Sequence, residues 1–277
     1  MNVFETPGQV SLQIQIPSGR VVVGTTDEPR TQVELISLGR RGQDALEQIQ
    51  VTHDERGGRH VVSIEQRNRI QWGPLQISWG GDVEVRVSCP LGTHLELSGA
   101  STDFRAEGRY GDVLARTASG DILIGEVAGK LEVKTASGDV SLESVEGENG
   151  TLATVSGDVA IGHAASELTL RTVSGDMELR VVDRPLTIST TSGDVDLRSL
   201  EGGELRVQSV SGDCRIGIGR GTRIWVDASS VAGDMKSELA MGDEMPEETE
   251  EPSGEVVPVQ VKTVSGDVAL VRALPVA

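Results

Sequence analysis

The sequence predicts an all-β fold, a parallel β-solenoid in which short strands stack coil upon coil. Three observations support this prediction. The triplet Ser-Gly-Asp, followed by an apolar residue, recurs at intervals of about 18 residues. Apolar residues alternate on both sides of the triplet, which is the period of a β-strand. Of the 277 residues, only 2% are aromatic whereas 34 are glycine, so Val, Leu and Ile must build the core between tight corners.

The aspartate of the triplet marks each repeat. It occurs at Asp121, Asp139, Asp158, Asp176, Asp194, Asp213, Asp234 and Asp267. The successive spacings are 18, 19, 18, 18, 19, 21 and 33 residues. Seven triplets read Ser-Gly-Asp, and the other is Ala232-Gly233-Asp234. A unit this short cannot bury its own apolar face, so stacked copies must share one continuous core.

Each repeat contains two short strands that meet at the triplet. In VKTASGDVSL, Val133 and Val140 have opposite parity, and a turn at Gly138-Asp139 resets the alternation so that both point inward. We therefore expect the glycine of each triplet to form a structural corner. These glycines are Gly120, Gly138, Gly157, Gly175, Gly193, Gly212, Gly233 and Gly266.

Residues 1–105 lack the triplet but still alternate as strands do, for example at Val10-Leu12-Ile14-Ile16. Ser18-Gly19-Arg20-Val21 resembles a decayed corner. One short helix is expected at Asp44-Ala45-Leu46-Glu47, where Asp and Glu have the spacing of a capping box. We expect this segment to be an irregular β cap, continuous with the regular coils of 106–277.

The long gap before the last triplet contains a segment of another kind. Residues 241–255 read MGDEMPEETEEPSGE, and Glu238 through Glu255 carry eight acids and no base. High charge, two prolines and no strand pattern predict a disordered acidic loop. The alternation of apolar residues that is typical of a β-strand resumes at Val257. We expect the coil around Asp267 to be the last coil of the stack.

Composition excludes several classes of function. The net charge of −18 argues against nucleic acid or an anionic membrane surface as a partner. The start MNVFETPGQVSLQIQI shows no signal peptide, and no run approaches the ~20 apolar residues of a membrane helix. We expect a cytoplasmic protein without direct membrane insertion; the extracellular surface is the alternative. Cys89 and Cys214 lack a metal or redox spacing, and Cys214 takes a repeat position held elsewhere by Val or Met, which indicates a buried thiol.

The repeated aspartates are the sharpest candidates for chemistry. Carboxylates stacked about 4.8 Å apart repel one another unless they are screened, and calcium is a natural counter-ion. Such a calcium ladder would contain Asp121, Asp139, Asp158, Asp176, Asp194 and Asp213. A uniform motif lacks the asymmetry of a catalytic site, so we favour a corner in which the carboxylate accepts backbone N–H groups. No catalytic residue, metal site or cofactor is assigned.

The remaining candidates have simpler explanations. The hydroxyls of the Thr-x-Ser pairs, such as Thr135 and Ser137, share parity with core residues, and we expect them to point inward and bond along the stack. Trp72 and Trp79 are expected to plug an open end of the solenoid; an exposed partner patch is the alternative. The histidines lack a partner at a catalytic spacing and are expected at the surface or in loops. They are His53, His60, His94 and His163.

The runs TASGDI, TASGDV, TVSGDV, TVSGDM, TTSGDV and SVSGDC resemble the bacterial putative-adhesin family of unknown function with β-strand (SGD) repeats, which is similar to toast-rack domains of envelope-stress and phage-shock-type systems. The resemblance spans nearly the whole chain, with VRVSCPLGTHLEL as the lead-in. It implies a right-handed β-solenoid (a single-stranded β-helix), no known enzymatic activity, and a role in adhesion or protein–protein scaffolding.

Three functions stay open on this basis. The first is a non-enzymatic scaffold, linked to envelope stress or signalling, that binds another protein through a side face or the acidic loop. The second is a surface adhesin that binds carbohydrate or calcium. The third is a self-polymerising rod similar to bactofilins. The expected partner is another protein and no nucleic acid, and the sequence does not predict the oligomeric state.

Overall fold

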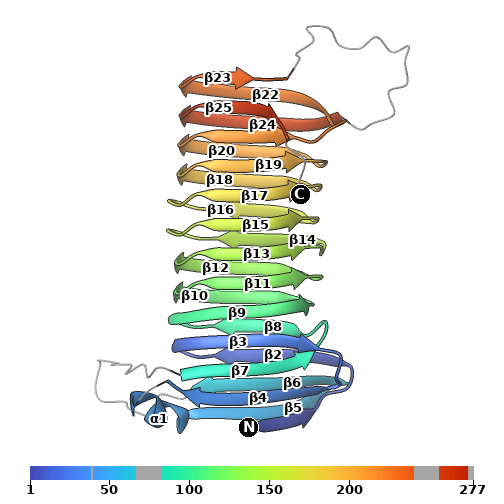
Figure 1. Cartoon of the computed structure of the whole chain (residues 1–277), viewed down its shortest axis with the longest axis vertical. Helices are drawn as coiled ribbons and strands as arrows, with labels where there is room; N and C mark the ends of the chain where they lie inside the picture. Colours follow the sequence, from blue (N-terminus) through green and yellow to red (C-terminus); the bar gives the residue numbers. More distant parts are fainter. Residues whose placement is uncertain (39, 67–82, 240–255, 274–277) are drawn as a thin grey trace. The chain divides into compact units, whose positions relative to one another are not determined.

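The computed structural model describes residues 1–38, 40–66, 83–239 and 256–273. The chain forms two compact units, Met1–Thr154 and Val155–Ala277, each built almost wholly from β-strands (Figure 1). The strands pair in stacked parallel coils, so the predicted all-β solenoid is confirmed. The boundary that the sequence predicts between residues 105 and 106 falls inside the first unit and stays a prediction.

The first unit contains the following elements: β1 (Asn2–Glu5), β2 (Gln9–Gln15), β3 (Ser18–Thr26), β4 (Arg30–Ser37), α1 (Arg40–Leu46), β5 (Ile49–Arg56), β6 (Arg59–Gln66), β7 (Val83–Pro90), β8 (His94–Ser98), β9 (Ser101–Tyr110), β10 (Val113–Ser119), β11 (Ile122–Val127), β12 (Leu131–Ser137), β13 (Val140–Val145) and β14 (Asn149–Ala153). The helix lies where one was predicted, but it begins at Arg40, so Asp44 is inside it and does not cap it.

The strands of this unit form two ladders. One runs β5–β6–β2–β8–β10–β12–β14 and the other runs β1–β4–β7–β3–β9–β11–β13. The later pairs are parallel and offset by one repeat, as in Val113↔Leu131. The pairs β1–β4, β4–β7 and β5–β6 are antiparallel, so the start of this unit departs from the parallel pairing of the later coils.

Chain order and stacking order differ at the start of this unit. Strands β2 and β3 pair with β6 and β7 on one side and with β8 and β9 on the other, although β4 to β7 follow them in sequence. The decayed corner at Ser18-Gly19 is a real corner, because Ser18 pairs with Ser101 and Gly19 has a φ of +127°.

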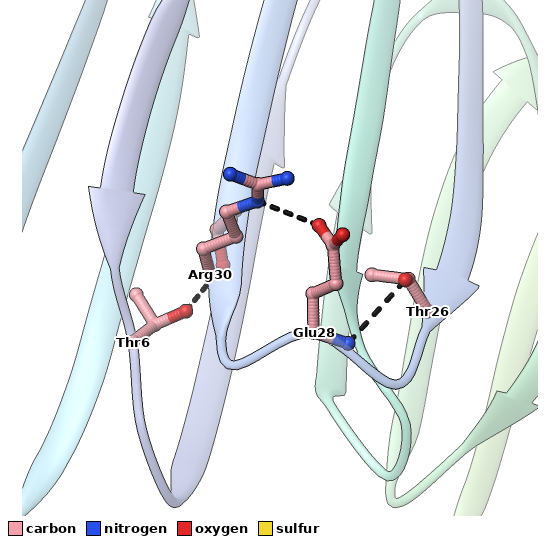
Figure 2. A network of polar contacts seen from close by, with 5 residues as sticks. Thr6, Thr26, Glu28 and Arg30 are labelled. Atoms are coloured by element: carbon pink, nitrogen blue, oxygen red, sulfur yellow. Dashed lines mark hydrogen bonds and ion pairs between the residues drawn. The ribbon is translucent and has the colours of Figure 1, made fainter.

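Polar contacts hold the reversal between β3 and β4 (Figure 2). The Glu28 N–H donates to Thr26 Oγ1 at 3.4 Å, and Arg30 Nε contacts Glu28 Oε2 at 2.6 Å. The buried hydroxyls of Thr6 and Thr31 share a hydrogen bond of 2.9 Å beside them. The Thr6–Thr31 bond links β4 to the residue that follows β1, and these two strands pair antiparallel.

The second unit contains the following strands: β15 (Val159–Ala164), β16 (Glu167–Arg171), β17 (Met177–Val182), β18 (Leu186–Ser192), β19 (Val195–Leu200), β20 (Leu205–Ser211), β21 (Cys214–Ile218), β22 (Arg223–Ala232), β23 (Met235–Ser237), β24 (Val256–Ser265) and β25 (Val268–Arg272). Their ladders run β16–β18–β20–β24–β22 and β15–β17–β19–β21–β25–β23, and every pair is parallel.

The last coil in sequence is not the last coil of this stack. Strands β24 and β25 lie between β20–β21 and β22–β23, as Figure 1 shows. The expectation that the coil of Asp267 closes the stack is therefore wrong. The physical reason is burial: Val257, Val259 and Val261 of β24 are at most 4% exposed, whereas no residue of β22 is buried. The inward positions of β24 and β25 hold Val261 and Leu270 where the paired positions of β22 and β23 hold Ala228 and Ser237, so the coil with the larger apolar inward side chains has a neighbour on both sides.

The turn at each triplet resets the alternation as the sequence predicts. Leu186 and Ile188 precede a corner, Val195 and Leu197 follow it with opposite parity, and all four side chains are at most 1% exposed. The apolar residues of both strands therefore fill one core. Outward positions are left for polar side chains and for any partner.

Candidate functional site

The corner glycines have a backbone that other residues rarely adopt. Gly138 has a φ of +130°, and a Cβ there would lie 2.2 Å from the carbonyl oxygen of Gly120 in the neighbouring coil. All eight corner glycines have φ between +122° and +157°. Glycine is needed twice over, for the conformation and for the close approach of the coils.

The aspartates of the second unit form a continuous hydrogen-bonded ladder. The N–H of each aspartate donates to the Oδ1 of the equivalent aspartate in the neighbouring coil. The bonds run from Asp176 to Asp158, Asp194 to Asp176, Asp213 to Asp194, Asp267 to Asp213 and Asp234 to Asp267, at 2.8–2.9 Å. The ladder gives the same coil order as the strand pairing. Each carboxylate thus joins two coils, whereas the sequence interpretation confined it to its own turn.

The ladder in the first unit includes an aspartate that the sequence analysis missed. Asp139 donates its N–H to Asp121 Oδ1 at 3.0 Å, and Asp121 donates to Asp103 Oδ1 at 3.2 Å. Thr102 stands where the other corners have glycine, so the triplet at Asp103 is not recognisable as a triplet. The spacing of 18 residues before Asp121 is the signal that could have found it.

The ladder is suited to joining coils rather than to chemistry. Each of these hydrogen bonds uses the aspartate Oδ1 to accept a backbone N–H of the neighbouring coil, which is a structural role and not that of a general acid or nucleophile. Among the described residues, no group of three or more His, Cys, Asp or Glu side chains is arranged to hold a metal ion. The calcium ladder stays a hypothesis with its own test.

The inward hydroxyls behave differently from the expectation. The threonines Thr135, Thr154, Thr172 and Thr190 are buried, as predicted. The serines of the same pairs are exposed, so the prediction that they point inward is wrong for Ser137, Ser156, Ser174 and Ser192. However, Thr172 Oγ1 donates to the Ser174 carbonyl two residues later, at 3.2 Å, and Thr117, Thr135, Ser209 and Thr263 make the equivalent bond. These bonds stay inside one corner and do not run along the stack. The carbonyl is nearer because the turn folds back over the side chain.

Two histidines have aspartate partners in a neighbouring coil. His163 Nε2 lies 3.0 Å from Asp183 Oδ1, and His94 Nδ1 accepts the Asp112 N–H at 2.9 Å. Asp112 Oδ1 in turn accepts the Lys130 N–H at 2.8 Å, which makes a short second ladder. The sequence analysis missed these pairs because it looked for close spacings, whereas the partners are 18 and 20 residues away, about one coil.

The other two histidines contact each other. His53 Nε2 lies 3.1 Å from His60 Nδ1, and Phe4 packs against the ring of His53 with centroids 5.2 Å apart. His60 is buried, so the expectation of a surface or loop position is wrong for it. The three rings join β1, β5 and β6 within the first unit.

Both cysteines are buried thiols. Cys89 and Cys214 are free and at most 1% exposed. Burial raises the pKa of each thiol to about 11, so both are neutral at physiological pH. This is the environment of a small apolar side chain and not of a nucleophile.

An exposed row of mainly valines runs along one outer face of the second unit. It consists of the residue before each triplet, which we call the valine row: Val155, Val173, Thr191, Val210, Val264 and Val231, in stacking order. Four of these valines are 50–53% exposed and Val231 is 82% exposed. Their parity is opposite to that of the buried Thr before them, which is a signal that the sequence contained and the sequence analysis did not use.

A shallow groove of about 340 Å³ lies over this row. Its lining residues are Ser189, Thr190, Gln208, Ser209, Val210, Lys262, Thr263 and Val264. Arg171 and Lys262 lie two positions before row residues and are exposed. The lining of this groove contains one basic residue, Lys262, and no acidic residue.

A larger groove, of about 600 Å³, lies on the first unit over β3, β7, β9 and β11. Its lining residues are Arg20, Val22, Glu84, Arg86, Asp103, Phe104, Arg105, Asp121 and Leu123. Three arginines face three acids, and Arg86 and Arg105 already pair with Glu84 and Glu107. The groove therefore has no excess charge with which to select an ion.

Two sequence-derived candidates, the acidic loop at 241–255 and the Trp72 and Trp79 segment, lie outside the described residues. Within the part of the chain that the structure describes, no helix has the length and apolar character needed to cross a membrane.

Comparison with known proteins agrees with this geometry. The family model Toastrack DUF4097 matches residues 10–271. The chain belongs to this family. The predicted resemblance is thereby confirmed, and the family match covers both units, including the inserted coils at each end of the sequence. No curated protein matches the chain.

Three of the solved structures that match the chain align with nearly all of it. A putative cell adhesion protein from Clostridium sporogenes has 7% identity and a TM-score of 0.29, with 98% of each chain covered. A putative lipid binding protein from Parabacteroides distasonis has 13% identity and a TM-score of 0.46, over 98% of this chain and 96% of that one. A putative adhesin from Bacteroides fragilis has 12% identity and a TM-score of 0.35, over 98% and 95%.

Proposed function

We propose that this chain is a non-enzymatic β-solenoid scaffold that binds another protein through the valine row of its second unit. The observation that carries the proposal is the exposure of this row. Aligned apolar side chains that are half-exposed or more form a contiguous patch, and such patches are typical of interaction surfaces. The uniform use of the corner carboxylates supports a scaffold rather than an enzyme.

The face also indicates the chemistry of the partner. The members of the row lie in neighbouring coils, so they are spaced by about 4.8 Å. Arg171 and Lys262 flank it with exposed positive charge. A partner surface that combines apolar residues with a few carboxylates would match this face, and opposite charges would favour its orientation.

Capture from an extract of the native cells tests the proposal. The doubly substituted chain Val173→Asp/Val210→Asp should lose a partner that the unchanged chain retains, because two carboxylates would interrupt the apolar row. Val173→Thr/Val210→Thr is the matched control, since Thr191 already occupies one position of the row. Leu123→Asp, at a 38% exposed site of the first unit, should leave capture unchanged.

Identical capture by the Asp variant and the unchanged chain would remove the valine row from the proposal. Fractionation of the same cells would decide between the cytoplasmic and surface settings that the sequence analysis left open. A partner found in the same fraction as the chain is required by the proposal.

A further inference from the structure

The end coil of the second unit has an open edge. Strand β22 pairs with β24, and β23 pairs with β25, and within the described residues neither has a partner on its other side (Figure 1). Strand β22 is ten residues long. The backbone N–H and C=O groups on the outer side of an edge strand can form hydrogen bonds with a further strand.

The apolar side chains of the core extend into this end coil, which is the last coil of the stack. Ile224, Val226 and Ala228 point inward, in register with the buried Val257, Val259 and Val261 of β24, yet they are only half-buried. Their unburied sides form an apolar layer at the end of the stack. Another layer of the same kind would bury it.

The edge strand β22 has fewer protecting charges than the edge strand β5 of the first unit. Strand β22 contains one Arg, one Asp, no Lys and no Pro, so its formal charge is zero in a chain with a net charge of −18. In the first unit, the edge strand β5 has Asp54, Glu55 and Arg56 at its end. Charged residues and proline are the usual means by which proteins prevent edge pairing.

We propose that two copies of this chain pair through the open edges of β22, antiparallel and about a two-fold axis. A second copy supplies both things that the edge lacks, a strand with free hydrogen-bonding groups and an Ile224–Val226–Ala228 layer of matching size. Because β22 carries no net formal charge, the two contacting strands add no like-charge repulsion at the contact itself. Because the same edge is used by both copies, the pairing closes at two and does not continue into a filament.

The contact is small. A ten-residue strand is about 33 Å long and a coil about 10 Å deep, so the footprint is roughly 330 Å² per copy. This is well below the ~800 Å² per partner of a stable complex. Pairing should therefore depend on concentration and reach half-saturation in the micromolar range or above.

Sedimentation velocity of the full chain tests the proposal. From low to high micromolar concentration, the weight-average mass should rise from 29.3 kDa toward twice that value and no further. Val226→Lys should raise the dissociation constant about tenfold or more, because it places a charge in the apolar layer. Val210→Lys, in the valine row, is the matched control and should leave the dissociation constant unchanged.

Two further measurements separate pairing from damage to the end coil. Ser229→Lys changes an exposed outward side chain of β22, and should weaken pairing while leaving the melting temperature unchanged. Amide hydrogen exchange in the unchanged chain should slow with concentration in β22 and not in β18. A monomer at every concentration, a mass beyond two copies, or loss of pairing with Val210→Lys instead of Val226→Lys would overturn the proposal. None of these results bears on partner binding by the valine row.

Discussion

At seven of the eight corner glycines, a Cβ would lie 2.1–2.3 Å from a carbonyl oxygen of the neighbouring coil. For Gly175 that oxygen belongs to Gly157, at 2.2 Å, and the Gly175 φ is +134°. The aspartate that follows, Asp176, donates its N–H to Asp158 across the same junction. The glycine allows neighbouring coils to approach closely, and the aspartate forms a hydrogen bond between them. The triplet therefore stabilises the stacking of the coils.

Gly175→Ala should destabilise the protein by about 2–4 kcal/mol, because it adds strain at positive φ and forces the coils apart. Gly221→Ala is the matched control. Gly221 has a φ of +84° but nothing within 4 Å of an added Cβ, so strain alone should cost about 1–2 kcal/mol. Urea unfolding measures both. Equal losses would show that the close approach at the corner has no energetic weight.

The single tyrosine should report base unfolding. Tyr110 is buried, and its hydroxyl lies 2.9 Å from the Val23 carbonyl and 2.8 Å from the Glu107 carbonyl. Burial, and then the nearby Cys89 and Glu107, raise the Tyr110 pKa. Its contribution to stability is therefore complete below the ordinary tyrosine pKa of about 10 and is lost as the pH rises beyond it.

We expect tyrosinate absorbance to develop only together with the loss of the β-sheet circular dichroism signal during an alkaline titration. Tyrosinate formation near its ordinary pKa in a chain with an intact signal would contradict the buried hydroxyl. Acid titration is the control, because Tyr110 stays neutral throughout it.

At the scale of the strands, position in the stack follows burial and not chain order. The coil of β24 and β25 interrupts the order between β20–β21 and β22–β23, just as β2 and β3 enter the stack between β6–β7 and β8–β9. In both cases an inserted coil has neighbours on two sides. A coil at an edge has one neighbour and correspondingly less buried apolar surface.

Hydrogen exchange at low protein concentration should find β24 more protected than β22, although β24 is closer to the C-terminus. Val257, Val259 and Val261 are buried, whereas no residue of β22 is. Amides at the end of a stack exchange through local opening, which breaks few contacts. Protection that falls steadily along the sequence from β20 to β25 would contradict the inserted order. Peptides from β18 provide an internal reference for a coil with two neighbours.

At the scale of the molecule, the acidic charge and the ladders act together. Exposed aspartates repeat in each unit, and their carboxylates accept neighbouring N–H groups. Those bonds offset part of the repulsion between stacked carboxylates, and salt screens the rest. The stability of the fold should therefore increase with ionic strength without any specific cation.

Calcium should raise the melting temperature no more than magnesium does at the same ionic strength. The reason is that no described cluster gathers the several oxygen ligands that calcium requires. Calorimetry with matched chloride salts measures the difference. A rise specific to calcium that disappears in Asp176→Asn would instead establish the calcium ladder. Asn keeps an oxygen that can accept the Asp194 N–H, so this variant separates metal binding from the corner bond.

Much of the fold could be predicted from the sequence because the residues that form each corner are close in sequence and recur in every repeat. Gly138, Asp139 and the parity of Val133 and Val140 are enough to predict a corner between two inward-facing strands. Asp103 was missed because Thr102 takes the glycine position, so the pattern fails although the geometry does not. The His163–Asp183 pair was missed because one coil separates its members in sequence.

The sequence by itself determined the all-β class, the stacked coils, the corners and the family. The reason is that every repeat contains the same local pattern of alternating apolar residues and a glycine turn. Only the tertiary structure decided which coil lies beside which, that each aspartate bonds to the next coil, and that the valine row and the β22 edge face solvent. Those properties depend on competition among similar apolar strands for the same core. Such a competition is settled by total burial in the folded chain and cannot be read from any single repeat.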